Sequence, residues 1–168
     1  LTPIVDNPDE AFTGGDAVVW KGMFQDKGKT GYHGYWGSNF YRVDEHLPSK
    51  DLDFGTLNHE LSERGIHTVL DIVGNHGSPA FGMPVAQPKY GQIFDASGTL
   101  VADQQNLPAD RLDPANNPLH RFYNNKTEMV QLSDLNENNP AVMDYLVGAY
   151  LQWIEQGADA FRIDTIKH

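Results

Sequence analysis

The 168-residue chain contains no cysteine. This absence excludes disulfides, thiolate catalysis and zinc sites with cysteine ligands, although it does not decide the cellular compartment. Basic side chains are also few, 12 against 23 acidic ones, which gives a formal net charge of -11. Because phosphates and anionic lipids would repel such a chain, the charge argues against nucleic acids and anionic membranes as partners. A neutral ligand is compatible with it.

Long apolar runs are also lacking. No stretch is long enough to span a bilayer, and the first residues given have neither the basic n-region nor the apolar h-region typical of a signal peptide. Leu1 is not a methionine, and the chain stops at His168 without a cap or polar tail, so we expect a fragment of a longer protein. The hydrophobic fraction of 39% and the aromatic fraction of 11% are nevertheless sufficient for a packed core.

One helix followed by one strand is predicted in the first half of the chain. Apolar residues four apart, with Thr56 as a suitable N-cap and Gly65 as a stop, predict a helix over about 56–63. Residues 67–73 then form a nearly continuous apolar run. Such a run is typical of a parallel strand that is buried on both faces.

A second helix and strand follow near the end of the chain. Asn139 and Pro140 are favoured as cap and first residue of a helix that ends at Gly157. The apolar positions that recur at helical spacing within it are Val142, Tyr145, Leu146, Ala149, Tyr150, Trp153 and Ile154. Residues 158–164 are interpreted as a buried strand that surfaces at its carboxyl end. This order predicts two βα units of an α/β fold with a parallel sheet.

Two other segments do not follow this pattern. Residues 77–131 mix prolines, glycines and many Asn and Asp residues with short apolar pieces, and they are too long for a plain connection, so we interpret them as an inserted subdomain. Residues 31–43 are the part densest in aromatic side chains. Aromatic rings can stack on sugar rings, but most aromatic side chains belong to cores, and composition alone favours a hydrophobic plug.

Polar side chains gather where the predicted strands end. Arg162 and Asp164 are two residues apart, so on a strand both leave the same face, and the arginine would keep the carboxylate ionised. Such a carboxylate can act as a nucleophile, a base or a metal ligand, although an ordinary ion pair explains the two residues equally well. The other polar residues near strand ends are His33, Tyr35, Asp71, Asn75, His76, Lys167 and His168. Together these clusters favour function, because reactive residues of a parallel barrel gather at the carboxyl ends of its strands.

Four stretches then resemble the signature regions of one family. They are Tyr32-His33-Gly34-Tyr35-Trp36, Asp71-x-x-x-Asn75-His76, Leu132-Ser-Asp134-Leu135-Asn136 and Gly157-x-x-x-Phe161-Arg162-x-Asp164-x-x-Lys167-His168. In this order they resemble the α-amylase superfamily (glycoside hydrolase family 13), retaining glycoside hydrolases and transglycosylases that act on α-glucans. The aromatic stretch is most similar to bacterial α-amylases and cyclodextrin glucanotransferases.

The resemblance implies a partial (β/α)8 TIM barrel of about strands 1–4, with an inserted domain B after strand 3. Residues 1–76 would be the first part of the catalytic barrel, 77–131 domain B, and 132–168 the barrel continued with helix 3 and strand 4. The missing remainder of the barrel would be a partner of this chain. The resemblance also implies an α-glucan or maltooligosaccharide substrate and an extracellular or periplasmic location.

For catalysis, the resemblance implies that Asp164 is the nucleophile and that Arg162 keeps it ionised and oriented. His33 and His76 would bond hydroxyls of the sugar at the cleavage point, and Tyr35 would stack on that sugar. The full set of residues implied to bind substrate is His33, Tyr35, Trp36, His76, Lys167 and His168. Lys167 and His168 belong to the acceptor side of the site.

The resemblance also implies a structural calcium, held by Asn75, Asp134 and the backbone carbonyl of His168. Calcium prefers several hard oxygen ligands and would clamp the insertion to the barrel. Asp71 would have a supporting role. A retaining mechanism needs a second carboxyl group ~5–5.5 Å from the first, and we assign none in this chain.

Three alternatives remain open from the sequence. The protein is an α-glucan hydrolase, or a transglycosylase of the cyclodextrin glucanotransferase type. The second alternative is a non-catalytic carbohydrate-binding relative that has kept the residues named above but has lost the carboxyl group that acts as general acid. A weaker alternative is an unrelated metal-dependent hydrolase with His76, His168 and Asp164 as ligands, which would require nitrogen-rich coordination instead of the all-oxygen coordination of calcium.

Overall fold

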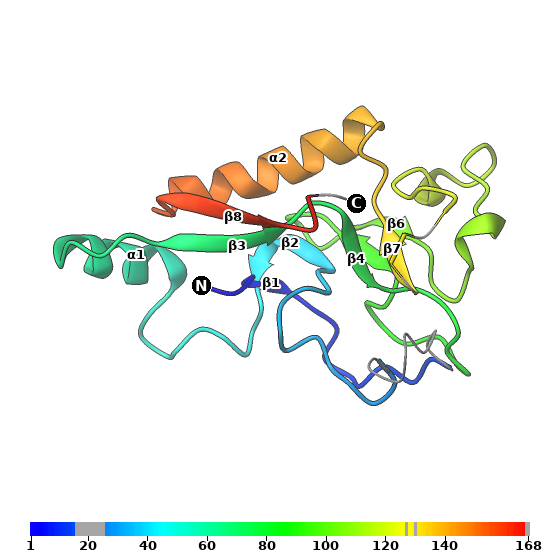
Figure 1. The fold of residues 1–168 in the computed structure, drawn as a ribbon, viewed down its shortest axis with the longest axis horizontal. Helices are drawn as coiled ribbons and strands as arrows, with labels where there is room; N and C mark the ends of the chain where they lie inside the picture. Colours follow the sequence, from blue (N-terminus) through cyan, green and yellow to red (C-terminus); the bar gives the residue numbers. More distant parts are fainter. Residues whose placement is uncertain (16–25, 127, 130, 167–168) are drawn as a thin grey trace.

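The structure is a computed structural model that describes residues 1–15, 26–126, 128–129 and 131–166 (Figure 1). Strands and short helices alternate with long loops, and two longer α-helices are present among the described residues. In chain order the elements are β1 (Val5–Asp6), β2 (Asn39–Val43), α1 (Phe54–Glu63), β3 (Val69–Val73), β4 (His76–Pro79), β5 (Gln92–Phe94), β6 (Leu100–Asp103), the 3-10 helices η1 (Ala109–Arg111) and η2 (Pro118–His120), β7 (Leu132–Asp134), α2 (Pro140–Glu155) and β8 (Ala160–Asp164).

Helix α1 begins two residues earlier than predicted. Its N-cap is Asp53, whose carboxylate accepts a hydrogen bond from the Thr56 N–H at 2.7 Å. The expectation that Thr56 is the cap was therefore wrong, because the preceding carboxylate already satisfies its amide within the first turn. Gly65 follows the helix with a φ of 70°, a left-handed conformation that favours glycine, and confirms the predicted stop.

Helix α2 begins and ends where the sequence predicted. The side chain of Asn139 accepts from the Ala141 N–H at 3.0 Å, Pro140 is the first helical residue, and Gly157 follows the helix with a φ of 97°. Its buried residues are Val142, Tyr145, Leu146, Ala149 and Trp153. Ile154, expected on this face, is 50% exposed instead. It belongs to a second apolar face at helical spacing, formed by Met143, Val147, Leu151 and Ile154, which no described element covers.

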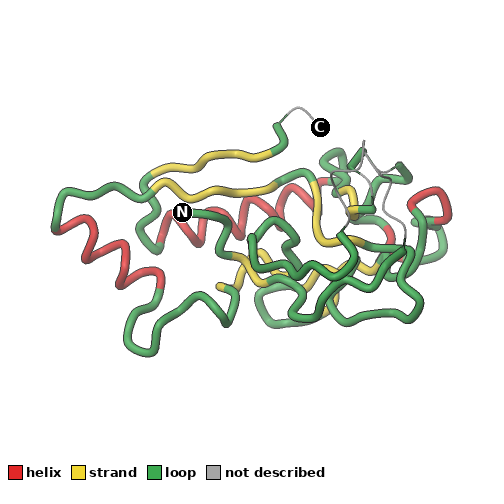
Figure 2. The backbone as a smooth tube through the Cα atoms, turned by 60° about the horizontal axis from the view of Figure 1, so that its bottom comes forward, coloured by secondary structure: helices red, strands yellow, loops and turns green. Residues whose placement is uncertain are grey.

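Strands β3 and β8 form the parallel pair that the sequence predicted. The register runs from Val69 opposite Ala160 to Val73 opposite Asp164. Helix α2 runs alongside this pair in both views (Figures 1 and 2), and Trp153 packs there in one hydrophobic cluster with Leu70. The terminal amine of Leu1 donates to the Val69 carbonyl at 2.8 Å, and its carbonyl accepts from the Asp71 N–H at 2.9 Å, which is the pattern of a parallel neighbour.

The two strands are less buried than predicted. Arg162 and Ile163 of β8 are exposed, and Val69 at the start of β3 is 47% exposed. Strand β8 is an edge strand among the described residues, because only β3 pairs with it. Strand β1 pairs antiparallel with β2 and does not extend the parallel sheet. The described residues therefore form no closed barrel, and four consecutive barrel strands are not observed.

The predicted insertion enters and leaves through one antiparallel ribbon. His76 of β4 lies opposite Asp134 of β7, and Pro79 lies opposite Leu132 (Figure 1). Between them, β5 and β6 form a second antiparallel pair. Tyr123 of this segment shares a hydrophobic core cluster with residues of α2 and β2. The domain boundaries at 77 and 131 stay a prediction.

No helix in the described parts of the chain is both long and apolar enough to cross a bilayer.

We expect these 168 residues, expressed alone, to associate or aggregate. The open edge of β8 and the uncovered apolar face of α2 both favour contacts between molecules. Size-exclusion chromatography with light scattering should detect association, and Val147→Glu with Leu151→Glu should reduce it if the helix face drives it. A soluble monomer with one sharp thermal transition would contradict this expectation.

Candidate active site

An ion-pair network joins β3 and β8, from the middle of both strands to the carboxyl end of β8. Asp71 and Arg162 are cross-strand neighbours in the parallel register. Nη1 of Arg162 lies 3.0 and 2.8 Å from the two carboxylate oxygens of Asp71, and 2.9 Å from Oδ1 of Asp164. The prediction that Arg162 and Asp164 leave the same face of the strand is therefore confirmed. One guanidinium bridges two carboxylates from neighbouring strands.

Tyr35 extends this network from the aromatic segment. Its hydroxyl donates to Oδ2 of Asp71 at 2.8 Å. The hydrogen bond to Asp71, with burial, raises the pKa of Tyr35, and the bond to Asp71 likewise raises the pKa of Arg162. Both groups therefore stay protonated at neutral pH. Asp71 accepts hydrogen bonds from both Tyr35 and Arg162, and this position is compatible with its expected supporting role.

His33 stacks beside Tyr35 and has a defined protonation state. The two ring centroids are 5.8 Å apart at 34°, and the Tyr35 N–H donates to Nδ1 of His33 at 3.0 Å. Burial lowers the pKa of His33, so the ring is neutral at pH 7. Because Nδ1 accepts a hydrogen bond, the ring proton belongs on Nε2. His33 can thus donate one hydrogen bond through Nε2 to an acceptor such as a sugar hydroxyl.

Trp36 does not lie at an accessible surface, contrary to its expected place among the substrate-binding residues. Its side chain is 5% exposed and packs in a hydrophobic cluster with Phe12, Met83, Tyr90 and Leu132. The ring centroids of Phe12 and Tyr90 lie 6.4 and 6.3 Å from it. The plug interpretation of the aromatic segment is therefore correct for this residue, because a buried indole face cannot stack on a ligand.

His76 differs from its expected position in the same way. It is only 3% exposed, and all four residues of β4 are buried. Its Nδ1 lies 3.5 Å from Nδ2 of Asn75. His76 lies on β4, which pairs with β7, and its low exposure leaves little of the imidazole accessible in this structure. Lys167 and His168 lie outside the described residues.

A small cavity brings Asp164 and Asn75 together. It has a volume of about 160 Å³, and the two residues line it with Glu137 and Thr165. Sequence reasoning missed Glu137, although it directly follows the Leu132–Asn136 stretch. The cavity therefore joins the end of β8 to the two ends of the insertion.

Asp134, expected to bind calcium, is a buried carboxylate next to this cavity. It is 7% exposed, and its only side-chain hydrogen bond among the described residues is with Nδ2 of Asn124 at 3.4 Å. Burial, together with the charges of Glu128 and Glu137, raises its pKa from 3.8 to about 6, although the hydrogen bond with Asn124 acts to lower it. A buried carboxylate near other oxygen ligands is the environment that a hard cation stabilises, so the residues present fit calcium.

The described residues do not test the nitrogen-rich metal site, because His168, one of its three expected ligands, lies outside them. Among the described residues, two groups of side chains come close enough to hold a metal ion, Asp9 with Glu45 and His46, and Asp6 with Asp44 and Glu45. Neither group includes Asp164 or His76, the other two expected ligands of that alternative.

Comparison with known proteins identifies the family. The model of the alpha-amylase catalytic domain matches residues 1–168, which is the whole chain. A cyclomaltodextrin glucanotransferase of Klebsiella oxytoca is 33% identical over 176 residues, covering 100% of this chain and 24% of the enzyme. An alpha-amylase of Niallia circulans is 30% identical over 148 residues, covering 83% of this chain and 26% of that protein. The chain thus spans about a quarter of the length of these relatives.

Comparison with solved structures gives the same family. A cyclomaltodextrin glucanotransferase with a three-domain ABC distribution aligns with a TM-score of 0.69 at 26% identity, over 99% of this chain and 32% of its own. The alpha-amylase of Geobacillus thermoleovorans, complexed with acarbose, aligns with a TM-score of 0.53 at 25% identity, over 100% and 30%. These are TIM-barrel proteins of which this chain covers part. The chain belongs to the alpha-amylase family and corresponds to a portion of its catalytic domain.

Proposed function

We propose that this chain is part of a retaining α-glucan hydrolase that cleaves α-1,4-glucosidic bonds through a covalent glycosyl-enzyme intermediate. The observation that carries the proposal is the guanidinium of Arg162, which contacts the carboxylate of Asp71 in the middle of β3 and that of Asp164 at the end of the parallel strand β8. Membership of the alpha-amylase family supports it. The expected role of every residue below is part of this proposal.

Asp164 is the proposed nucleophile. One of its carboxylate oxygens forms a bond to the anomeric carbon, while the bond from that carbon to the glycosidic oxygen breaks and its electrons leave with that oxygen. The leaving oxygen takes a proton from a second carboxyl group, to which we assign no described residue. Water then releases the sugar from Asp164 with retained configuration.

Arg162 pairs with this nucleophile and holds it in place. Its ion pair with Asp164 stabilises the carboxylate, and the two hydrogen bonds to Asp71 orient the guanidinium. Arg162 is 54% exposed at its side chain, so solvent screens part of this attraction. A sugar that covers the site would remove that water and strengthen the interaction.

The neighbouring residues bind the sugar in this proposal. His33 donates from Nε2 to a hydroxyl, and Tyr35 offers a ring whose hydroxyl is held by Asp71. Lys167 and His168 contact the acceptor side, as the family resemblance implies. The contact of His76 with a sugar hydroxyl stays a prediction from the family resemblance, since its side chain is buried in this structure.

A transglycosylase is the second candidate. The similarity to cyclomaltodextrin glucanotransferases of K. oxytoca and other bacteria supports it. The nucleophile and its arginine would be unchanged, and a sugar hydroxyl would replace water as acceptor. Analysis of products from a single starch digestion separates the two candidates, because cyclic products require transfer. A carbohydrate-binding relative without the acid would yield no products at all.

Calcium is part of the proposal. Asn75 and Asp134 would give side-chain oxygens, and His168 its backbone carbonyl. Bound calcium would supply positive charge to the buried Asp134 and tie the β4–β7 ribbon to the end of β8. Of the residues named, Asn75 shares a cavity with Asp164.

The remaining organisation follows the family. Residues 1–76 and 132–168 would be barrel and 77–131 domain B. The open edge of β8 and the face of Met143, Val147 and Leu151 would be covered by the rest of that barrel. An extracellular or periplasmic location belongs to the same proposal.

Asp164→Asn in the full-length protein should lower starch turnover by at least about a thousandfold, because an amide cannot form the covalent intermediate. Release of reducing sugar measures this. Asp159→Asn is the matched control, since Asp159 lies just before the opposite end of β8 and bonds the Thr68 N–H. It should keep the activity of the folded enzyme. If Asp164→Asn keeps its activity, Asp164 is not the nucleophile.

The metal-free protein should lose stability as the pH rises from about 4 to 6. In this window the folded state holds a proton on Asp134 that the unfolded state has released, so unfolding becomes easier by about 2 kcal/mol. Urea unfolding in a chelator, repeated across the window, measures the slope. Asp134→Asn has no carboxyl group to ionise at this position, so its free energy of unfolding should depend less on pH. Parallel profiles for the two proteins would contradict the raised pKa.

Calcium should raise the melting temperature of chelator-treated protein at pH 7. A concentration of about 100 times Kd contributes about 2.7 kcal/mol. Asp134→Asn should lose most of this gain, whereas Asp110→Asn, a change in the same insertion but in η1, should keep it. An equal response in both variants would show that calcium binds elsewhere.

A further inference from the structure

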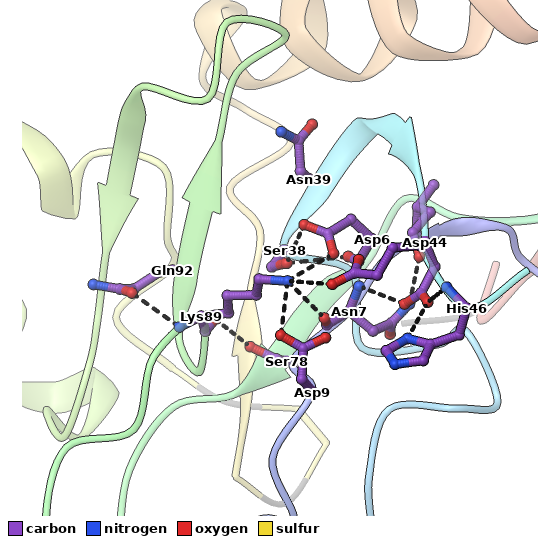
Figure 3. A network of polar contacts seen from close by, with 12 residues as sticks. Asp6, Asn7, Asp9, Ser38, Asn39, Asp44, His46, Ser78, Lys89 and Gln92 are labelled. Atoms are coloured by element: carbon purple, nitrogen blue, oxygen red, sulfur yellow. Dashed lines mark hydrogen bonds and ion pairs between the residues drawn. The ribbon is translucent and has the colours of Figure 1, made fainter.

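Lys89 connects the insertion to the segment that begins at β1. Its Nζ lies 2.9 Å from Oδ1 of Asp6 and 3.1 Å from Oδ2 of Asp9 (Figure 3). The same ammonium donates to the carbonyl of Asn7 at 3.4 Å. A longer ion pair, of 3.8 Å, joins it to Glu45. None of these residues has a role in the function proposed above.

The backbone of Lys89 is held in an unusual conformation. Its φ of 66° lies in the left-handed region, which is unfavourable for a residue with a Cβ. The Lys89 N–H donates to Oε1 of Gln92 at 3.1 Å, and the Lys89 carbonyl accepts from Oγ of Ser78 at 3.1 Å (Figure 3). Ser78 is fully buried and also accepts from the Gly91 N–H at 2.8 Å. The surrounding residues therefore fix the position from which the ammonium reaches Asp6.

Burial makes the ion pair between Lys89 and Asp6 costly to break. The side chain of Lys89 is 25% exposed and that of Asp6 is 13% exposed. Burial lowers the pKa of Lys89, but its contacts with Asp6 and Asp9 outweigh burial and raise this pKa overall, so the ammonium is charged at neutral pH. Burial raises the pKa of Asp6 even with Lys89 beside it. Without Lys89 this carboxylate would have to take up a proton or move toward water.

The segment that Lys89 contacts holds the aromatic turn. Oδ1 of Asn7 accepts from the Trp36 N–H at 2.8 Å. The carbonyl of Asp6 accepts from the Ser38 N–H at 2.8 Å. Asn7 is 2% exposed, and a Cβ at Gly31 would collide with its side chain. The position of the turn therefore depends on the position of residues 6 and 7.

Tyr35 carries this dependence to the candidate active site. It directly precedes Trp36, and its hydroxyl donates to Oδ2 of Asp71 at 2.8 Å. Asp71 shares the guanidinium of Arg162 with Asp164. A continuous series of contacts therefore leads from the insertion to the proposed nucleophile. Such a series becomes a functional link only if the two ends are energetically coupled, which a double-mutant cycle measures.

We propose that Lys89 is a positioning residue of the candidate active site. By fixing Asp6 and Asn7, its ammonium places the aromatic turn so that the Tyr35 hydroxyl reaches Asp71. The inference rests on the proposed function, and Lys89 itself touches no substrate. Because a small displacement of the reacting groups slows the chemical step, loss of this ammonium should lower kcat more than it raises KM.

The test uses the full-length protein and the release of reducing sugar from starch. Lys89→Met keeps the length of the side chain but removes its charge, and it should lower kcat about tenfold while changing KM by less than about twofold. Lys89→Arg supplies another cation and should recover most of kcat. Lys50→Met is the matched control, since Lys50 is exposed in the loop between β2 and α1. It should have the kcat of the parent.

A double-mutant cycle with Tyr35→Phe separates positioning from a general loss of stability. Tyr35→Phe removes the hydroxyl that bonds Asp71, so adding Lys89→Met to it should lower kcat by less than about twofold further. A further loss as large as that in the parent overturns the inference. A Lys89→Met enzyme with the kcat of the parent overturns it as well.

Asp6→Asn weakens the same ion pair from its other side, and it keeps the experiment decisive if Lys89→Met does not fold. Its effect on kcat should also largely disappear when Tyr35→Phe is present, and an undiminished effect contradicts the inference. A parent protein that releases no sugar contradicts the proposed function, and the positioning role fails with it. An active parent with an equally active Lys89→Met variant contradicts the positioning role alone.

Discussion

The contact of one guanidinium with two carboxylates across β3 and β8 is the interaction on which the site depends. Arg162 is the cation shared by two partly buried carboxylates, Asp71 in the middle of β3 and Asp164 at the end of β8. Its position follows from the parallel register, which sets Asp71 opposite Arg162. Tyr35 then attaches the aromatic turn to the same group of charges. Geometry at the site is thus a property of strand pairing.

Helix α2 holds these parts in place. Trp153 packs on Leu70 of β3 and donates from its indole to the Phe40 carbonyl of β2 at 3.2 Å. Tyr145 accepts from the Phe40 N–H and donates to the Phe94 carbonyl of β5. Helix α2 therefore holds the parallel β3–β8 pair, the antiparallel β1–β2 pair and the insertion together, because its apolar face is wide enough to contact all three.

The sequence predicted those features that depend on interactions between residues close in the chain. Asn139, Pro140 and Gly157 predicted the limits of α2, since capping depends on neighbours in sequence. The alternation of β8 predicted the shared face of Arg162 and Asp164. Burial could not be predicted in this way. Whether Trp36 belongs to a core cluster, and whether His76 is buried, depends on segments distant in the chain.

Lys89 shows what such a distant contact implies. The insertion supplies this single ammonium to carboxylates from two other segments, Asp6 and Asp9 on one side and Glu45 on the other. Attraction between partly solvated charges weakens with ionic strength, whereas the apolar contacts of the insertion strengthen slightly in excluded salts. The ion pairs and the apolar contacts that attach the insertion to the rest of the protein therefore respond oppositely to salt. In dilute salt the ion pairs contribute more to this attachment, and in concentrated salt the apolar contacts contribute more.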